Sequence, residues 1–343
     1  MAPVYGIAAC KGGQGKSTTV SNLARLCALY GARVLVVDLA QPGTATTSLR
    51  DIFPDGEFGE LSGAMLSFQR LAPGARPDMA RARAALEAMR LPILLQSQPS
   101  WSGGFVAALP WDELLGDAAA QLPSNLILRG LLDALAGAVD VVLMDFPAEG
   151  GPLLTNALAA TDCVIVPLVP ETPALEGLET TLRLLARGRE AGHAIRLGGI
   201  LLTRCDPKNK RAIEIVQTLR QSGEVEGEPL GQQLFRFAIR QNEFFEQAYR
   251  YGEPIWERSS NAAHWAGYVL LAEWLLRDAG LAHLAAARRG PALLAADTRI
   301  LDIAALMLPE PEVRLSDFEA AHATSGAARA ETARGRTGMG ART

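Results

Sequence analysis

A glycine-rich segment near the start of the chain carries the strongest chemical signal in the sequence. It reads Lys11-Gly12-Gly13-Gln14-Gly15-Lys16-Ser17-Thr18. Glycines let backbone N–H groups converge on phosphate oxygens, and a helix that begins directly after them adds unpaired N–H groups. Lys16 can reach the β- and γ-phosphates, and the Ser17 hydroxyl can ligate Mg²⁺. The segment therefore predicts a site for ATP phosphates, against the alternative of a plain strand-to-helix turn.

Apolar strands alternate with helical stretches along the rest of the chain. We expect strands at Val4–Ala9, Arg33–Val37, Val139–Met144, Cys163–Leu168 and Gly199–Thr203, and helices at Gly15–Tyr30, Leu175–Arg187, Lys210–Gln221 and Ser260–Arg277. Continuous apolar strands of this kind favour an α/β fold with a mostly parallel sheet and helices on both faces. Ligands bind at the carboxyl ends of such strands, where Gly12–Gly15, Asp38 and Asp145 would lie together.

Other stretches are less regular. The region Arg50–Leu126 contains Pro- and Gly-bearing loops around a helix expected near Asp78–Arg90, and we interpret it as an elaboration of the same domain. The main domain is predicted to cover residues 1–280, followed by a helical extension at 281–318 that includes a packing helix over Leu293–Leu308. Residues 319–343 are rich in Ala, Gly, Thr and Arg, so this tail is predicted to be disordered.

Bulk composition places the chain among ordinary globular proteins. It has 343 residues, 49% of them hydrophobic and 20% charged, with a formal net charge of −4. This charge argues against a wholly cationic surface but leaves room for a local basic face. The four cysteines show no metal-ligand spacing, which favours buried free thiols: Cys10, Cys27, Cys163 and Cys205. No leader or membrane-spanning segment is predicted, so the cytoplasm is the expected location.

The second lysine of the glycine-rich segment makes the pattern more specific. Lys11-Gly-Gly-x-Gly-Lys16-Ser resembles the deviant Walker A motif of the ParA/MinD family of P-loop ATPases. The resemblance implies that Lys11 reaches the phosphates bound by a second subunit, in an ATP-sandwich homodimer. It also places Lys11, Lys16 and Asp38 among the catalytic residues. The alternative for Lys11 is a solvated surface lysine.

Further segments resemble the same family over roughly residues 1–280. Asp145-Phe146-Pro147 is similar to the Walker B aspartate with its following proline, so Ser17, Asp145 and Asp38 are the predicted Mg²⁺ residues. Five further segments resemble partition ATPases of the ParA type: Leu153–Leu158, Val164–Pro167, Pro170–Glu171, Ala174–Leu178 and Gly199–Thr203. The stretch Ile239–Asn242 is similar to the one that packs near adenine, which makes Arg240 and Asn242 nucleotide contacts, although the usual proline before the arginine is absent.

One position departs from the family pattern. The second strand of the family ends in Asp-x-Asp-Pro-Gln-Gly, and its second aspartate is credited with positioning the attacking water. Here the segment reads Asp38-Leu39-Ala40-Gln41-Pro42-Gly43, and no other acid occurs before Arg50. Loss of a positioned acid or base costs about 10²–10⁴-fold in rate. We therefore expect tight ATP binding with slow hydrolysis. Gln41 could orient a water as a glutamine does in some GTPases, or it faces solvent or caps the turn.

Basic residues gather in the C-terminal half of the predicted domain. They are Arg204, Lys208, Lys210, Arg211, Arg236, Arg240, Arg250 and Arg258. The resemblance implies that this region holds DNA without sequence preference, whereas interleaved acids such as Asp206 and Glu246 fit a solvated helix face.

Three functions remain open on the sequence. The first is a partition or cargo-positioning ATPase of the ParA type, associated with the nucleoid and regulated by a ParB-like adaptor. The second is a hydrolysis-deficient dimer switch or scaffold that uses Leu281–Phe318 for docking. The third is a MinD-like membrane-positioning ATPase, but the tail lacks the apolar stripe that this requires. An electron carrier of the nitrogenase iron-protein type is discounted because the cysteines are not placed to bridge a cluster.

Overall fold

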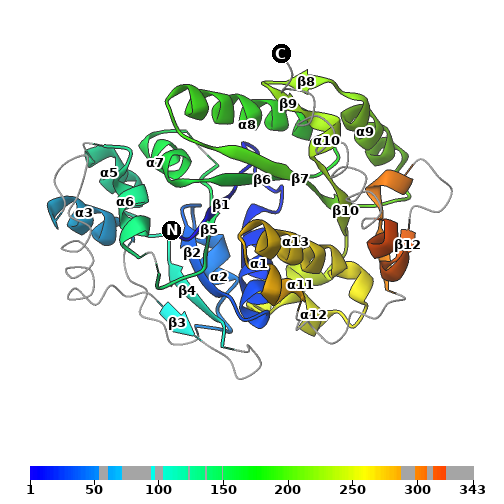
Figure 1. The fold of residues 1–343 in the computed structure, drawn as a ribbon, viewed down its shortest axis with the longest axis horizontal. Coiled ribbons are helices and arrows are strands. Elements are labelled where there is room, and N and C mark those ends of the chain that lie inside the picture. Colours follow the sequence, from blue (N-terminus) through cyan, green and yellow to red (C-terminus); the bar gives the residue numbers. More distant parts are fainter. Residues whose placement is uncertain are drawn as a thin grey trace, which may run out of the picture.

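An eight-stranded sheet forms the centre of the computed structural model (Figure 1). The structure describes residues 1–53, 61–71, 94–96, 103–122, 124–135, 137–148, 150–286, 298–306 and 312–321. The strands lie in the order β10-β7-β6-β1-β5-β2-β4-β3, and only the pairing of β3 with β4 is antiparallel. The predicted mostly parallel α/β sheet is confirmed.

Most strands of this sheet whose side chains the structure describes are deeply buried. The strands of the sheet are β1 Val4–Ile7, β2 Arg33–Asp38, β3 Leu94–Gln96, β4 Phe105–Leu109, β5 Val141–Asp145, β6 Cys163–Leu168, β7 Arg196–Cys205 and β10 Leu234–Arg240. Alternate residues of one strand enter opposite cores: Val142 of β5 belongs to one apolar cluster and Leu143 to the other. Burial on both faces explains why these strands read as continuous apolar runs.

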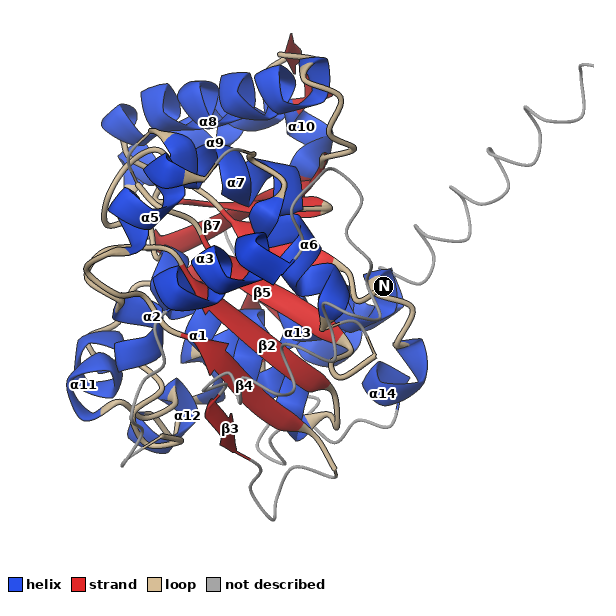
Figure 2. Cartoon of the chain, turned by 90° about the vertical axis from the view of Figure 1, so that its left-hand side faces the viewer, coloured by secondary structure: helices blue, strands red, loops and turns tan. Residues whose placement is uncertain are grey.

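Helices cover both faces of the sheet (Figure 2). One core receives side chains from α3 Leu61–Leu71, α5 Leu115–Gln121, α6 Ile127–Ala134, α7 Pro152–Ala160, α8 Thr172–Glu190, α9 Lys210–Gln221 and α10 Leu230–Gln233. The other core receives side chains from α1 Lys16–Leu29, α2 Thr44–Thr47, α11 Phe244–Tyr251, α12 Ile255–Arg258, α13 Ala266–Asp278 and α14 Ala282–Ala286. A small hairpin, β8 Glu224–Val225 with β9 Glu228–Pro229, precedes α10.

The C-terminal part contains strands as well as helices. After α14, strands β11 Arg299–Leu301 and β12 Glu312–Arg314 pair antiparallel, with a 3-10 turn at Ile303–Ala305 and a helix at 315–321. The prediction of one packing helix over Leu293–Leu308 is therefore wrong for the described residues 298–306. The first residues of the tail predicted to be disordered, 319–321, are helical, and 322–343 lie outside the described residues, as does the helix expected near Asp78–Arg90.

Two further observations concern the class of protein. Among the described residues, no helix combines the length and the apolar character needed to cross a membrane.

The cysteines are free thiols, and three of them are buried, whereas Cys10 is partly exposed beside the glycine-rich segment. The prediction that all four are buried is thus wrong at Cys10.

Candidate nucleotide site

The glycine-rich segment forms the loop between β1 and α1, at the carboxyl edge of the sheet. Gly13 and Gly15 have φ angles of 75° and 88°, in the left-handed region that a side chain at either position would strain. Gly15 directly precedes α1, whose first turn has no side-chain cap. The unpaired N–H groups at this helix start are therefore available to an anion such as a phosphate.

Gln14 holds the loop against the sheet. Its Oε1 accepts a hydrogen bond from the backbone N–H of Val169 at 2.8 Å, and its carbonyl oxygen accepts one from the Thr203 hydroxyl at 2.9 Å. The residue is buried. The Gln14 side chain thus anchors the loop to the segment after β6, and its carbonyl oxygen anchors the loop to Thr203 of β7.

Two buried carboxylates lie behind the loop. Asp38 and Asp145 are register partners at the ends of β2 and β5, and both are fully buried. Burial raises the pKa of Asp145, the nearby charge of Asp38 raises it further, and the Ser17 hydroxyl and the Lys16 ammonium oppose the rise. Neither carboxylate oxygen of Asp145 has a hydrogen-bond partner of good geometry. A bare buried carboxylate beside a serine hydroxyl is a donor set that suits Mg²⁺ together with phosphate oxygens.

Asp38 has a different role from Asp145. Its Oδ2 accepts hydrogen bonds from the Thr46 N–H and hydroxyl at 2.8 and 2.9 Å, and its Oδ1 accepts one from the Ala40 N–H at 3.2 Å. Burial raises the pKa of Asp38, and the bonds from Thr46 and Ala40 oppose that rise. Asp38 therefore shapes the loop that follows β2, and Asp145 is the carboxylate left open for a cation.

The loop after β2 carries the position that lacks the expected acid. Ala40 is 8% exposed, and its methyl group can neither accept a proton nor orient a water molecule. Gln41 is exposed, which agrees with the alternative that it faces solvent. The site thus combines groups whose chemistry suits phosphates and a cation with a loop that offers no carboxylate other than the buried Asp38.

A cavity of about 710 Å³ opens over the loop. It is lined by Gly13, Gln14, Gly15, Lys16, Ser17, Thr18, Thr44, Thr203, Arg204, Ile239, Gln241, Asn242, Glu243, Phe245, Glu246 and Tyr268. Of the predicted phosphate-loop residues, Lys11 and Gly12 do not line it. Lys11 instead packs beside Gly177 of α8.

Several cavity residues were not identified from the sequence as nucleotide contacts. Tyr268 comes from α13, where its hydroxyl lies 3.4 Å from the Thr19 hydroxyl, and the Phe245 ring packs edge-on against it. Only the three-dimensional fold brings α13 to the loop. Arg204, predicted as a DNA contact, lines the cavity with an unusual φ of 48°. The position of Arg204 at the end of a predicted parallel strand, where ligands bind in such sheets, is the sequence feature that points to the cavity.

The two predicted adenine contacts separate in the structure. Asn242 lines the cavity, and its Oδ1 is buried without a hydrogen-bond partner. Arg240 points elsewhere and forms an ion pair with Glu312 at 2.6 Å. The prediction for Arg240 therefore differs from the structure, because an acid from the C-terminal part engages its guanidinium.

The remaining predicted DNA contacts fall into two groups. Lys208, Lys210 and Arg211 are exposed at the start of α9, and Arg211 donates hydrogen bonds to the Thr172 hydroxyl. Three arginines are paired with acids: Arg236 with Asp302, Arg250 with Glu246 and Arg258 with Glu253. The pair of Arg250 is widely spaced, at 3.8 Å, and highly exposed, so it contributes little.

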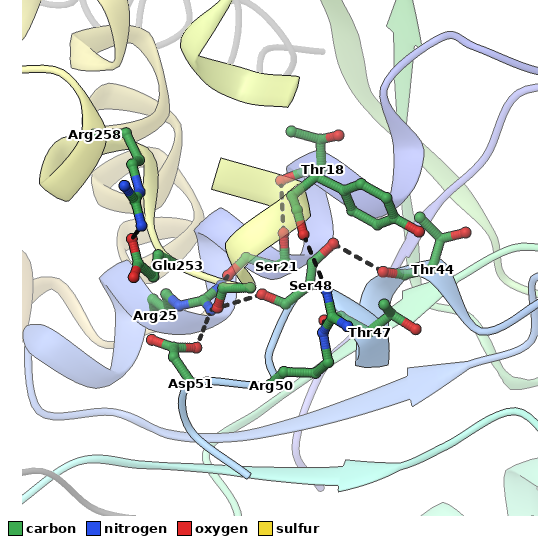
Figure 3. Close-up of polar contacts among 12 residues, drawn as sticks. Thr18, Ser21, Arg25, Thr44, Thr47, Ser48, Arg50, Asp51, Glu253 and Arg258 are labelled. Atoms are coloured by element: carbon green, nitrogen blue, oxygen red, sulfur yellow. Dashed lines mark hydrogen bonds and ion pairs between the residues drawn. The ribbon is translucent and has the colours of Figure 1, made fainter. Parts of the chain in front are cut away.

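A buried arginine connects the site to its surroundings (Figure 3). The guanidinium of Arg25, on α1, donates hydrogen bonds to the Ser48 and Gly252 carbonyl oxygens at 2.6 and 2.7 Å and forms an ion pair with Asp51. The side chain is only 3% exposed. Arg25 therefore joins the phosphate-loop helix to the segment after α2 and to the turn after α11, which the sequence alone did not indicate.

Comparisons with known proteins agree with this geometry. The pattern that defines the CobQ/CobB/MinD/ParA nucleotide binding domain matches residues 5–255. The chromosome-partitioning ATPase Soj of Thermus thermophilus is 31% identical over 268 residues, which are 77% of this chain and 91% of that protein. The chromosome partitioning protein ParA of Myxococcus xanthus is 29% identical, over 71% of this chain and 77% of that protein. Cobyrinic acid a,c-diamide synthase from Mycobacterium smegmatis, solved with ADP and magnesium, superposes with a TM-score of 0.59 at 23% identity, covering 85% of this chain and 98% of that one.

Proposed function

We propose that residues 1–280 of this chain, which belongs to the CobQ/CobB/MinD/ParA nucleotide-binding family, form an ATP-binding domain of a ParA/Soj-like partition protein. One observation carries the proposal. The open carboxylate of Asp145 is buried beside Ser17 and Lys16, directly behind a loop of unpaired N–H groups. A buried, unpartnered carboxylate is costly, and a bound Mg²⁺ with its nucleotide would compensate it.

Each residue of the site has a task in this proposal. The N–H groups of Gly13 to Thr18 bind the phosphate oxygens, and Lys16 neutralises their charge. Ser17 and Asp145 would hold Mg²⁺, and the cation would offset the negative charge of the phosphates. Asp38 keeps the loop after β2 in place through Thr46. Asn242 offers its free Oδ1 to a hydrogen-bond donor such as the amino group of adenine.

Dimer formation is part of the same proposal. Lys11 does not line the cavity of its own chain, and its Cβ lies beside Gly177 of α8. Its ammonium group is proposed to reach phosphates bound by a second copy. The proposed assembly is a homodimer that encloses ATP between its subunits. Exposed Lys208, Lys210 and Arg211 form the proposed contact with duplex DNA, and a ParB-like adaptor would regulate the nucleoid-bound state.

Hydrolysis is proposed to be slow because Ala40 provides no group for the attacking water. This same observation favours a second function, a dimer switch or scaffold that binds ATP but scarcely cleaves it. Turnover with and without DNA and a candidate adaptor separates the two functions. An adaptor that raises the rate at least tenfold identifies a partition ATPase, and a rate that stays at the basal level identifies the scaffold.

Nucleotide binding itself is tested by calorimetric titration of the purified chain with ATP and Mg²⁺. We expect binding by the wild type and its loss in Lys16→Ala, with Lys210→Ala as a matched control because Lys210 is exposed and outside the cavity. Equal affinity in all three proteins would contradict the proposed site.

A further inference from the structure

The segment beyond the family match packs against the outermost strand of the sheet. The match ends at residue 255, and the described residues 298–306 and 312–321 lie against β10 (Figure 1). Phe237 of β10 and Asp302 form an antiparallel bridge. The ring of Phe318 lies edge-on to Phe237, with 6.5 Å between ring centroids. We call residues 298–306 and 312–321 the C-terminal cover.

The cover engages three arginines of the sheet edge and of α9. Asp302 pairs with Arg236 at 3.1 Å, and Glu312 pairs with Arg240 at 2.6 Å. Arg220 donates hydrogen bonds to two backbone carbonyl oxygens of the cover, those of Ile303 and Ala304, at 3.1 and 3.0 Å. All three guanidinium groups are thus turned toward the cover.

These contacts are of the kind that a polyanion would make. A guanidinium binds a carboxylate and a phosphate by the same forked geometry, so Asp302 and Glu312 occupy positions that phosphate oxygens could take. The Arg236 and Arg240 side chains are 30% and 22% exposed, and the Asp302 side chain is 7% exposed. The pairs are therefore partly shielded from solvent and are not ordinary surface pairs.

We propose that the C-terminal cover competes with duplex DNA for the arginines of β10. This inference rests on the DNA binding proposed above and adds an intramolecular control to it. With the cover in place, only the exposed cluster of Lys208, Lys210 and Arg211 contacts DNA. With the cover displaced, Arg236 and Arg240 add two phosphate contacts. Arg240 directly precedes Gln241 and Asn242, which line the nucleotide cavity. Displacement of the cover would therefore also affect the part of the cavity where Asn242 is proposed to contact adenine.

The test uses the full chain with the double substitution Asp302→Asn and Glu312→Gln. Asparagine can still accept the hydrogen bond that Asp302 receives from the Ala304 N–H at the start of the 3-10 turn. Asp317→Asn is the control for the loss of one negative charge, because Asp317 is an exposed acid of the same cover, and Glu312→Gln alone is its charge-matched counterpart. Binding to a duplex of random sequence is measured with ATP and Mg²⁺ over a range of salt concentrations. Far-UV circular dichroism checks folding.

The expected result is tighter DNA binding by the double variant than by the control. Its plot of log affinity against log salt should be steeper by up to about 1.8, which is about 0.9 for each released arginine. Between about 50 and 200 mM salt its affinity should therefore fall about twelvefold more than that of the control. If Asp302→Asn prevents folding, Glu312→Gln alone should give about half of that change in slope.

The opposite outcomes overturn the inference. If the wild type binds DNA and the double variant matches the Asp317→Asn control, the cover does not compete, and the proposed DNA binding stands. If none of the proteins retains DNA at low salt, the inference and the proposed DNA contact both fail.

Discussion

Replacement of Arg25 by methionine should destabilise the protein by about 3 kcal/mol, at the low end of the 3–5 kcal/mol expected for breaking a buried ion pair. The substitution removes the ion pair with Asp51 and the hydrogen bonds to the Ser48 and Gly252 carbonyl oxygens. The low end applies because the Asp51 side chain is 23% exposed and can recover part of its hydration. In thermal unfolding this loss corresponds to a fall in Tm of about 4 °C, because the unfolding entropy grows with the length of the chain.

Arg50→Met is the control in the same network (Figure 3). Arg50 donates to the carbonyl oxygens of Thr47 and Arg250, but it does so at the surface, so its loss should cost less than about 1 kcal/mol. Urea unfolding of the two variants and the wild type gives both values. Equal stability of Arg25→Met and Arg50→Met would refute the view that the buried guanidinium joins these three segments.

Three other substitutions follow from the site. Because burial raises the pKa of Asp145, the metal-free wild type should lose stability as the pH rises from the ordinary carboxyl value near 4 through the raised pKa. Asp145→Asn should remove that loss and raise the Tm of the metal-free protein at pH 8, while Mg²⁺-dependent ATP binding disappears in calorimetry. Gly15→Ala, at a φ of 88°, should weaken ATP binding at least tenfold in the same titration. Lys11→Ala should leave ATP binding intact but abolish the ATP-dependent dimer in analytical ultracentrifugation.

The parallel core could be predicted because its residues carry the signal locally. Cys163–Leu168 and Lys210–Gln221 are found with the predicted bounds, since apolar runs buried on both faces and helix periodicity are readable from neighbouring residues. The C-terminal part could not be predicted in the same way. Ile300 and Leu301 are buried by pairing with β12 and packing on β10, and such distant partners leave no periodic signal in the segment itself.

In the candidate site, too, features carried by contiguous residues could be predicted, and features that depend on distant partners could not. The phosphate loop is recognisable because its glycines and Lys16 are contiguous. Gln14 anchors the loop through its side chain to Val169 and through its backbone carbonyl oxygen to Thr203, and both partners lie far away in the sequence. The sequence predicts that Arg240 contacts the nucleotide because its neighbours resemble a family segment, but its ion pair with Glu312 depends on a region outside the family match.

In the proposed function the site holds ATP but lacks the group that helps to cleave it. The direct test is single-turnover hydrolysis of bound ATP, with Mg²⁺, in the wild type and in Ala40→Asp. We expect stoichiometric ATP binding by both proteins and hydrolysis that is about 10²-fold or more faster in Ala40→Asp. Equal rates in the two proteins, at the level of an ordinary ATPase, would contradict this expectation.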